Sequence, residues 1–193
     1  MPADVTELPL FPLQTVLFPG GPLQLRVFEP RYLDMVARCL RGTNRFGVVA
    51  IASGAEVGDA TTYDVGTTAE IVDWHQEEHG VLGLRALGRE VFRLVKTRRE
   101  PDGLYVGEVT LLDAPRALPP LAEHAPLVAL LRQLVDQLPQ FRMATPAFDD
   151  AFWVGGRLIE LLPLALAFKQ SLLEIEDPHA RLERLAAALR PAD

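Results

Sequence analysis

Cysteine and serine are scarce in this chain of 193 residues, and each shortage excludes a kind of chemistry. Cys39 is the only cysteine, so no intramolecular disulfide can form, which suits a reducing compartment and predicts a cytoplasmic location. Ser53 and Ser171 are the only serines, and neither lies in a G-x-S-x-G sequence. Lys169 precedes Ser171 at a spacing that points helical side chains apart, so the two do not predict a serine–lysine dyad.

The chain also lacks basic character, a long apolar run and a phosphate-binding loop. Its formal net charge of −7 and isoelectric point near 5.1 argue against a nucleic-acid partner. The longest apolar run, residues 158–168, contains Glu160 and is shorter than the roughly 20 residues of a membrane helix, so we expect no membrane partner. The first residues, MPADVTELP, are not of signal-peptide type. No G-x-x-x-x-G-K-[ST] sequence occurs, and we expect no cofactor.

Proline divides the most informative stretch, residues 8–32. A proline fixes the backbone angle φ and removes a hydrogen-bond donor, so none of these prolines is expected in a central strand. The stretch therefore predicts short extended pieces joined by fixed corners. Pro19-Gly20-Gly21-Pro22 is the sharpest corner. Beyond it, residues 23–27 alternate between apolar and polar and predict a half-buried strand, and Pro30 is well placed to begin a helix.

The pattern that follows predicts one helix and then several strands. A helix is expected over 30–41, with Leu33, Val36, Ala37 and Leu40 on one apolar face and Gly42 as a left-handed cap. Residues 53–64 are expected to form a loop. Strands are predicted at 46–52, 66–75, 81–87, 91–97 and 104–112, a spacing typical of a small barrel.

Composition changes at residues 114–120, and the strand signals stop there. Helices are predicted at about 126–138, 152–162, 164–174 and from Pro178 onward, with Pro163 as a break and Asp177 as an N-cap. The predicted fold class is α+β: a β pseudobarrel with one inserted helix in residues 1–117, followed by an all-helical subdomain in residues 118–193.

Three sequence motifs, in order, connect the chain to a known family. LPLFPLQTVLFPG at 8–20, LQLRVFEPRYLDMV at 23–36 and FGVV at 46–49 closely resemble the start of the substrate-binding domain at the N-terminus of Lon proteases, which also occurs as a stand-alone protein. The resemblance resumes at residues 66–71, 157–174 and 181–183. It implies a pseudobarrel with one inserted helix and a role in holding polypeptide. The chain contains no counterpart of the Lon ATPase or Ser-Lys peptidase motifs, so we expect neither ATP hydrolysis nor proteolysis.

Several other residue groups were weighed against simpler explanations. His75 and His79 have the spacing of a zinc pair on a helix, but the segment reads as a solvated strand end, and we predict no metal site. Cys39 is expected to be a partly buried, inert thiol. Asp149 and Asp150 are expected to cap the following helix. Core positions are predicted for the aromatic residues Phe141, Phe148, Phe152 and Trp153.

The candidate site is the strand-to-helix corner of the proline-rich stretch. A structural ion pair among Arg26, Glu29 and Arg31 would explain its charges, and a polar rim beside an aromatic anchor is the alternative. We predict a catalytically inactive module that binds polypeptide, including unfolded segments and degrons, chiefly through its β part. The alternatives are a small-ligand sensor or a hydrolase with its site between the two parts. The oligomeric state stays open. The candidate peptide-binding residues are Phe18, Arg26, Phe28, Glu29, Arg31 and Tyr32.

Overall fold

The computed structural model describes residues 5–56, 60–114, 116–138 and 146–190. The chain divides into two compact units, Met1–Asp113 and Ala114–Asp193. Strands and one long helix make up the first unit, and the elements of the second are all helical among the residues described. The chain is therefore an α+β protein, as predicted.

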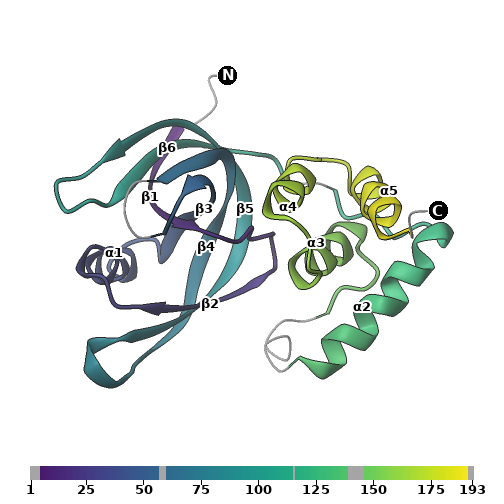
Figure 1. The fold of residues 1–193 in the computed structure, drawn as a ribbon, viewed down its shortest axis with the longest axis horizontal. Helices are drawn as coiled ribbons and strands as arrows, with labels where there is room; N and C mark the ends of the chain where they lie inside the picture. The colour runs from purple at the N-terminus through teal and green to yellow at the C-terminus, as the bar shows by residue number, and fades with distance from the viewer. Residues whose placement is uncertain (1–4, 57–59, 115, 139–145, 191–193) are drawn as a thin grey trace. The chain divides into compact units, whose positions relative to one another are not determined.

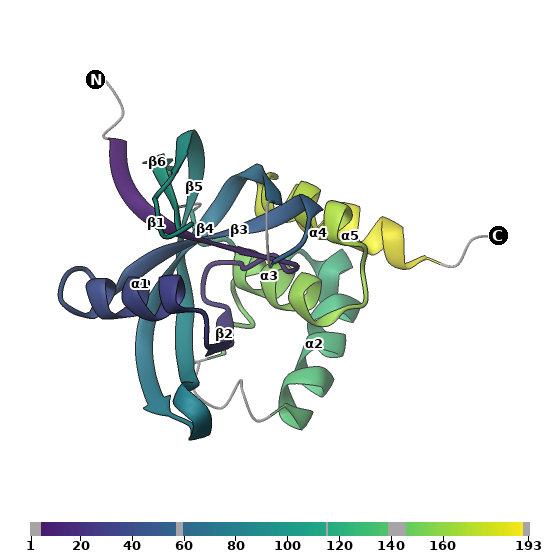
Figure 2. The same cartoon turned by 60° about the vertical axis from the view of Figure 1, so that its left-hand side comes forward.

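The first unit is a six-stranded sheet that closes on itself (Figures 1 and 2). The strand order is β2-β5-β4-β3-β1-β6, and an additional pairing of β5 with β6 makes a ring in which β2 is attached to β5 alone. All pairings are antiparallel except β1 with β3. The strands are β1 (Val5–Leu13), β2 (Pro22–Val27), β3 (Arg45–Gly54), β4 (Ala60–Gln76), β5 (Leu82–Arg99) and β6 (Tyr105–Leu111).

Strand β1 is an interior strand although it contains two prolines, so the expectation that no proline would enter such a strand is wrong. Pro9 lies in the pairing with β6, which covers Val5 to Leu10, and Pro12 lies in the pairing with β3, which begins at Leu10. Each half of β1 thus forms backbone hydrogen bonds with a neighbouring strand on one side only. A proline is tolerated there because its missing N–H can face the side that has no partner.

The β4 and β5 strands are longer than the sequence predicted. β4 begins at Ala60, inside the expected loop, and β5 runs unbroken through Gly88, where we expected a gap between two strands. Gly88 lies in the strand because the chain around Phe18 packs directly over it: a Cβ atom at Gly88 would lie 2.2 Å from the carbonyl oxygen of Phe18. The glycine marks a close approach of two backbones and does not mark a turn.

Helix α1 (Pro30–Leu40) begins at the predicted proline, but its buried face differs from the predicted one. Tyr32, Met35, Val36 and Cys39 pack on the barrel, while Leu40 is exposed. The cap also differs, because Asn44 and not Gly42 has the left-handed backbone, with φ of 57°. The core beneath α1 holds side chains from all six strands and the helix, among them Leu13, Leu23, Val27, Phe46, Val48, Ile71, Leu84 and Val106.

The second unit contains α2 (Ala125–Gln137), α3 (Ala151–Leu161), α4 (Leu166–Leu173), α5 (Pro178–Leu189) and the short 3-10 turn η2 (Ala122–His124). Two predicted helix caps are confirmed. The Asp150 side chain accepts a hydrogen bond from the backbone N–H of Phe152, and the Asp177 side chain accepts a hydrogen bond from the backbone N–H of His179. Trp153 is buried as predicted, while Phe148 and Phe152 are half-buried. Phe141 lies outside the described residues.

None of the helices described is both long and apolar enough to cross a membrane.

Candidate functional site

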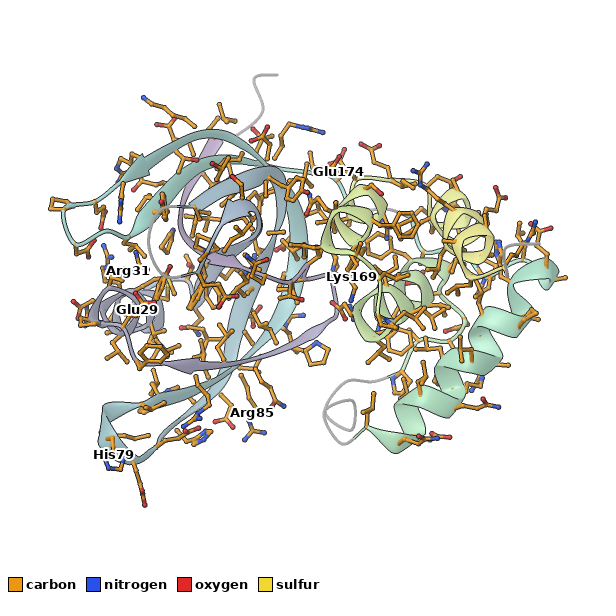
Figure 3. All side chains as sticks on the ribbon, in the orientation of Figure 1. Glu29, Arg31, His79, Arg85, Lys169 and Glu174 are labelled. Carbon is orange, nitrogen blue, oxygen red and sulfur yellow. The ribbon has the colours of Figure 1, made fainter. Side chains whose placement is uncertain are left out.

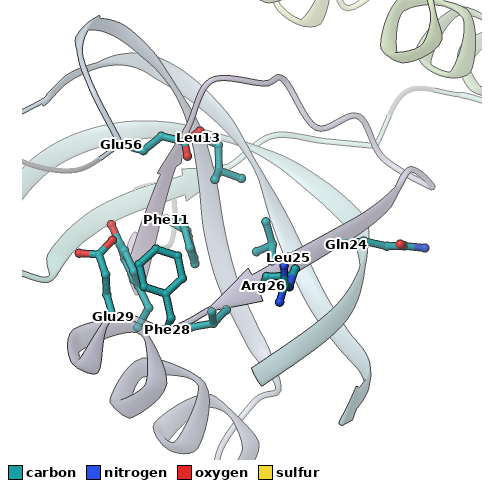
Figure 4. A pocket seen from close by; sticks show the side chains of 10 residues that line it. Phe11, Leu13, Gln24, Leu25, Arg26, Phe28, Glu29 and Glu56 are labelled. Atoms are coloured by element: carbon teal, nitrogen blue, oxygen red, sulfur yellow. The ribbon is translucent and has the colours of Figure 1, made fainter. Parts of the chain in front are cut away.

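A pocket of about 210 Å³ opens in the first unit between β1, β2 and the start of α1 (Figure 4). Figure 4 shows Phe11 and Leu13 on β1, with Leu25 and Arg26 on β2 facing them across the pocket. We call this the β1–β2 pocket. Its lining combines apolar side chains with a few charged ones: Phe11, Leu13, Gln24, Leu25, Arg26, Val27, Phe28, Glu29, Tyr32 and Glu56.

The corner between β2 and α1 forms one end of the pocket and is held by Arg31. The Arg31 guanidinium lies 2.8 Å from the Glu29 carboxylate and donates a hydrogen bond of 3.1 Å to the carbonyl of Gly103. Figure 3 shows Glu29 and Arg31 together at the start of α1. Since Arg31 is buried, these contacts are structural, and the predicted ion pair at this corner is confirmed for Glu29 and Arg31.

Tyr32 joins the pocket to the core. Its ring stacks on that of Phe11, with centroids 4.0 Å apart and planes 9° from parallel. Burial raises the pKa of the Tyr32 phenol to about 12, so the hydroxyl stays protonated at neutral pH. In this state the phenol can donate a hydrogen bond but is not poised to act as a base or nucleophile.

Arg26 belongs to a separate group on the outer face of the β4–β5 hairpin. Its guanidinium lies 2.9 Å from the Glu77 carboxylate, and the His75 imidazole lies 3.4 Å from the same carboxylate. The strand register explains this grouping, because Arg26, Gly83 and His75 are directly opposite one another on β2, β5 and β4. Arg26 therefore borders the pocket without joining the Glu29–Arg31 pair.

Of the six predicted site residues, Arg26, Phe28, Glu29 and Tyr32 line the pocket. Phe28 is the most exposed large apolar side chain among those described, at 63%. Arg31 lies behind the pocket, where it supports Glu29. Phe18 is a correction: its side chain is buried, with 0% exposed, so it cannot contact a ligand in this conformation.

Six of the lining residues, Val27 among them, were not predicted as site residues from the sequence. Phe11 and Leu13 lie in the stretch that it singled out, and their alternation could have placed them on one face of a strand. Gln24 and Leu25 lie in the predicted strand, but the sequence does not show which edge is left open. Glu56 comes from the segment after β3, and no local pattern connects it with the pocket.

The other candidate groups are explained by structure. His75 lies in β4 and His79 at the tip of the hairpin, so the two do not share a helix face (Figure 3). The Cys39 thiol is buried and lies 3.1 Å from the Arg45 carbonyl, and burial raises its pKa to about 11, so it is predominantly protonated and unreactive at neutral pH. Lys169 donates to the Glu160 carbonyl, and Ser171 donates to that of Phe168.

One group in the second unit has the residue types of a metal site. Ligand atoms of Glu123, His124 and Glu183 lie within 4.8 Å of one another. The backbone N–H of Leu121 donates to Nδ1 of His124, which leaves the proton of the neutral ring on Nε2, the atom that faces Glu123 at 3.8 Å. A metal would need the lone pair of that nitrogen, so the tautomer that the Leu121 contact favours does not suit a metal ligand. Nε2 has no hydrogen-bond partner within the described residues.

Comparison with known proteins identifies the family. The family model of the ATP-dependent protease La (LON) substrate-binding domain matches residues 7–190. The chain therefore belongs to the Lon substrate-binding domain family, as its motifs indicated.

Solved structures agree with this assignment. A Lon N-terminal domain protein from Xanthomonas campestris is 40% identical and superposes with a TM-score of 0.80, over 96% of this chain and 99% of that one. The N-terminal domain of Lon protease from Mycobacterium avium complex shares the fold at 18% identity, with a TM-score of 0.62 over 94% of this chain and 97% of that one.

The chain is also similar to parts of larger proteins. Lon protease 2 of Myxococcus xanthus is 27% identical over 185 residues, which is 91% of this chain and 22% of that protease. Cereblon of Xenopus tropicalis is 32% identical over 117 residues, 58% of this chain and 25% of cereblon. The chain thus matches about a quarter of the length of these relatives.

Proposed function

We propose that the chain is a polypeptide-binding module and that the β1–β2 pocket is where it holds its ligand. One observation carries the proposal: the pocket places the exposed ring of Phe28 beside Leu25, Leu13 and Phe11. An exposed aromatic side chain beside more deeply buried apolar ones is typical of recognition surfaces. Membership in a family of substrate-binding domains supports polypeptide as the ligand class. Within that class we propose unfolded segments and degrons.

The charged groups of the pocket favour binding over catalysis. Glu29 is neutralised by Arg31 and Arg26 by Glu77, and the Tyr32 hydroxyl is protonated at neutral pH. A hydrolase mechanism would require an acid and a base that face each other, and both Glu29 and Arg26 are instead held in ion pairs. We therefore favour a binding role over the hydrolase alternative.

The size of the β1–β2 pocket argues against a small-ligand site within this pocket. Sites for drug-sized molecules usually enclose about 300–1,000 Å³ and bury most of the ligand. The β1–β2 pocket measures about 210 Å³ and is open along β2, which suits one or two side chains of a longer ligand.

The single buried thiol, Cys39, supports the cytoplasmic location that we propose for the module.

The test is titration of the full chain with a fluorescently labelled, reduced and unfolded protein, measured by anisotropy. An extended segment loses conformational freedom on binding, so we expect affinities of about micromolar or weaker. Phe28→Ala should weaken binding by roughly 5–30-fold, the usual loss for an aromatic anchor. Val95→Ala is the matched control, since Val95 is 59% exposed on β5 and lies outside the pocket.

Equal losses in the two variants would remove the pocket from the proposal. If the wild-type chain shows no saturable binding at any salt concentration, the proposal of polypeptide binding is refuted. The small-ligand alternative would then be favoured.

A further inference from the structure

Strand β2 has an open edge, and its hydrogen-bonding pattern can be assigned. β2 pairs only with β5 among the strands described. The Gly88 N–H donates to the Gly21 carbonyl at 2.9 Å, and the β2–β5 pairing continues from there without a register shift. In an antiparallel ladder, residues that exchange hydrogen bonds alternate with residues that do not. Leu23, Leu25 and Val27 therefore direct their backbone groups toward β5.

It follows that the backbone N–H and C=O groups of Gln24 and Arg26 point away from β5. Pro22, which has no N–H, occupies the same outward-facing register, where a proline costs no ladder hydrogen bond. Both Gln24 and Arg26 line the β1–β2 pocket, so this open edge runs along it. Unpaired strand edges of this kind are templates for an added strand.

The strand across the pocket cannot serve equally well. β1 loses its β6 partner after Leu10, but the part that remains is short and includes Pro12, which has no N–H to donate. An extended segment entering the pocket therefore meets one edge that can both donate and accept, the edge of β2.

The side chains of the pocket define the chemistry of the segment. A residue directly opposite Leu25 would face the same side of the sheet as Leu25, toward Phe11, Leu13 and Phe28, so apolar residues are favoured at alternate positions. Of the two carboxylates, Glu29 is paired with Arg31 at 2.8 Å. Glu56 accepts a hydrogen bond from the Gln14 N–H at 2.7 Å and has no ion pair within the described residues, so it favours a basic residue in the ligand.

We propose that β2 receives its polypeptide ligand as an added β-strand, through the backbone groups of Gln24 and Arg26. The ligand is a proline-free extended segment with apolar residues at alternate positions and a lysine or arginine that reaches Glu56. This rests on the proposed function and adds its binding mode: main-chain hydrogen bonds supply affinity that tolerates many sequences, and the pocket selects the alternation.

The first experiment changes the ligand. A labelled peptide of about ten residues, alternating valine and leucine with threonine and lysine, is titrated against the full chain, and its backbone nitrogens are then methylated in two alternate sets. Methylating the set that faces β2 should lower affinity by about tenfold or more, since each lost hydrogen bond weakens binding several-fold. Methylating the other set should lower it by less than about threefold, since those groups make no bond to β2.

The second experiment changes the protein. Gln24→Pro removes the outward N–H and, as at Pro22, leaves the β5 ladder intact. Gln24→Ala keeps the N–H and removes only the side chain, so the difference between the two variants measures the hydrogen bond. Amide exchange followed by NMR gives an independent readout: peptide should slow exchange at Gln24 and Arg26, and leave that at Leu25 unchanged.

The outcomes separate the binding mode from the function. Peptide that binds with equal sensitivity to both methylated sets, and without protection of Gln24 and Arg26, overturns strand addition while polypeptide binding stands. No binding of any unfolded protein or peptide overturns both. Concentration-dependent protection of Gln24 and Arg26 without peptide means that a second copy of the chain occupies the edge, which also overturns the proposal.

Discussion

At the scale of single residues, Tyr32 connects stability with the proposed site. Its ring packs face to face with Phe11 in the core, and its edge lines the β1–β2 pocket. Arg31 beside it closes the β2–α1 corner onto Gly103. The corner should therefore influence folding more than binding, because the side chains that hold it are buried and the exposed anchor is Phe28.

Tyr32→Ala should lower the free energy of unfolding by about 3–5 kcal/mol and lower the melting temperature, because it removes a stacked, buried ring. Phe28→Ala is the control and should change stability by less than about 0.5 kcal/mol, because Phe28 is largely exposed. An unchanged melting temperature in Tyr32→Ala would contradict the structural role of this corner.

Alkaline pH should destabilise the chain through two buried acids. Burial raises the pKa of Cys39 from 9.0 to about 11 and that of Tyr32 from 10.0 to about 12. The unfolded chain therefore releases these protons first, so the stabilising contribution is complete below about pH 9 and declines as pH rises through the folded-state pKa values. Urea unfolding at pH 7 and pH 10.5 should show the decline, and Cys39→Ala with Tyr32→Phe should reduce it. A slope identical in the wild type and the double variant would refute this assignment.

At the scale of elements, the C-terminal end of α4 depends on a side chain from α5. Arg181 is buried and donates to the carbonyls of Leu172, Leu173 and Ile175, groups that a helix end leaves without intrahelical partners. Burial lowers the pKa of this guanidinium to about 10, which still leaves it charged at neutral pH. A positive charge at a helix C-terminus is favourable.

Arg181→Met should lower the free energy of unfolding by about 2–4 kcal/mol, because it leaves buried carbonyls without a donor. Arg184→Met is the matched control on the same helix, since Arg184 is exposed. Loss of helical circular dichroism in urea is the measurement. If Arg181→Met were as stable as wild type, the desolvation cost of the guanidinium would equal what its hydrogen bonds contribute.

At the scale of the whole molecule, the net charge of −7 should affect how fast ligands arrive. Basic, apolar segments should associate faster at low salt, because long-range attraction raises the association rate and is screened at high ionic strength. Apolar contacts should set the affinity that remains at high salt. Stopped-flow mixing with a lysine-containing peptide and with its glutamate counterpart measures the effect. Equal salt dependence for the two peptides would rule out electrostatic steering.

Much of the fold was predictable because the signals are local. Pro30, Asp150 and Asp177 mark helix starts by their own backbone preferences or by hydrogen bonds to residues close in sequence. The apolar run of β3 identifies a buried strand in the same way, since Phe46–Ile51 is buried throughout. The family motifs added the barrel with its inserted helix, and four of the six predicted site residues do line the pocket.

The sequence by itself thus determined the helices, most of the strands, the fold class and the family. Tertiary structure decided which face of α1 is buried, how β1 accommodates Pro9 and Pro12, that Phe18 is buried and closed to a ligand, and that Glu56 and Phe28 line the same pocket. These features depend on residues far apart in the chain that pack together or leave an edge unpaired. The local sequence does not predict such contacts, because the burial of a side chain and the exposure of a strand edge are properties of the assembled sheet.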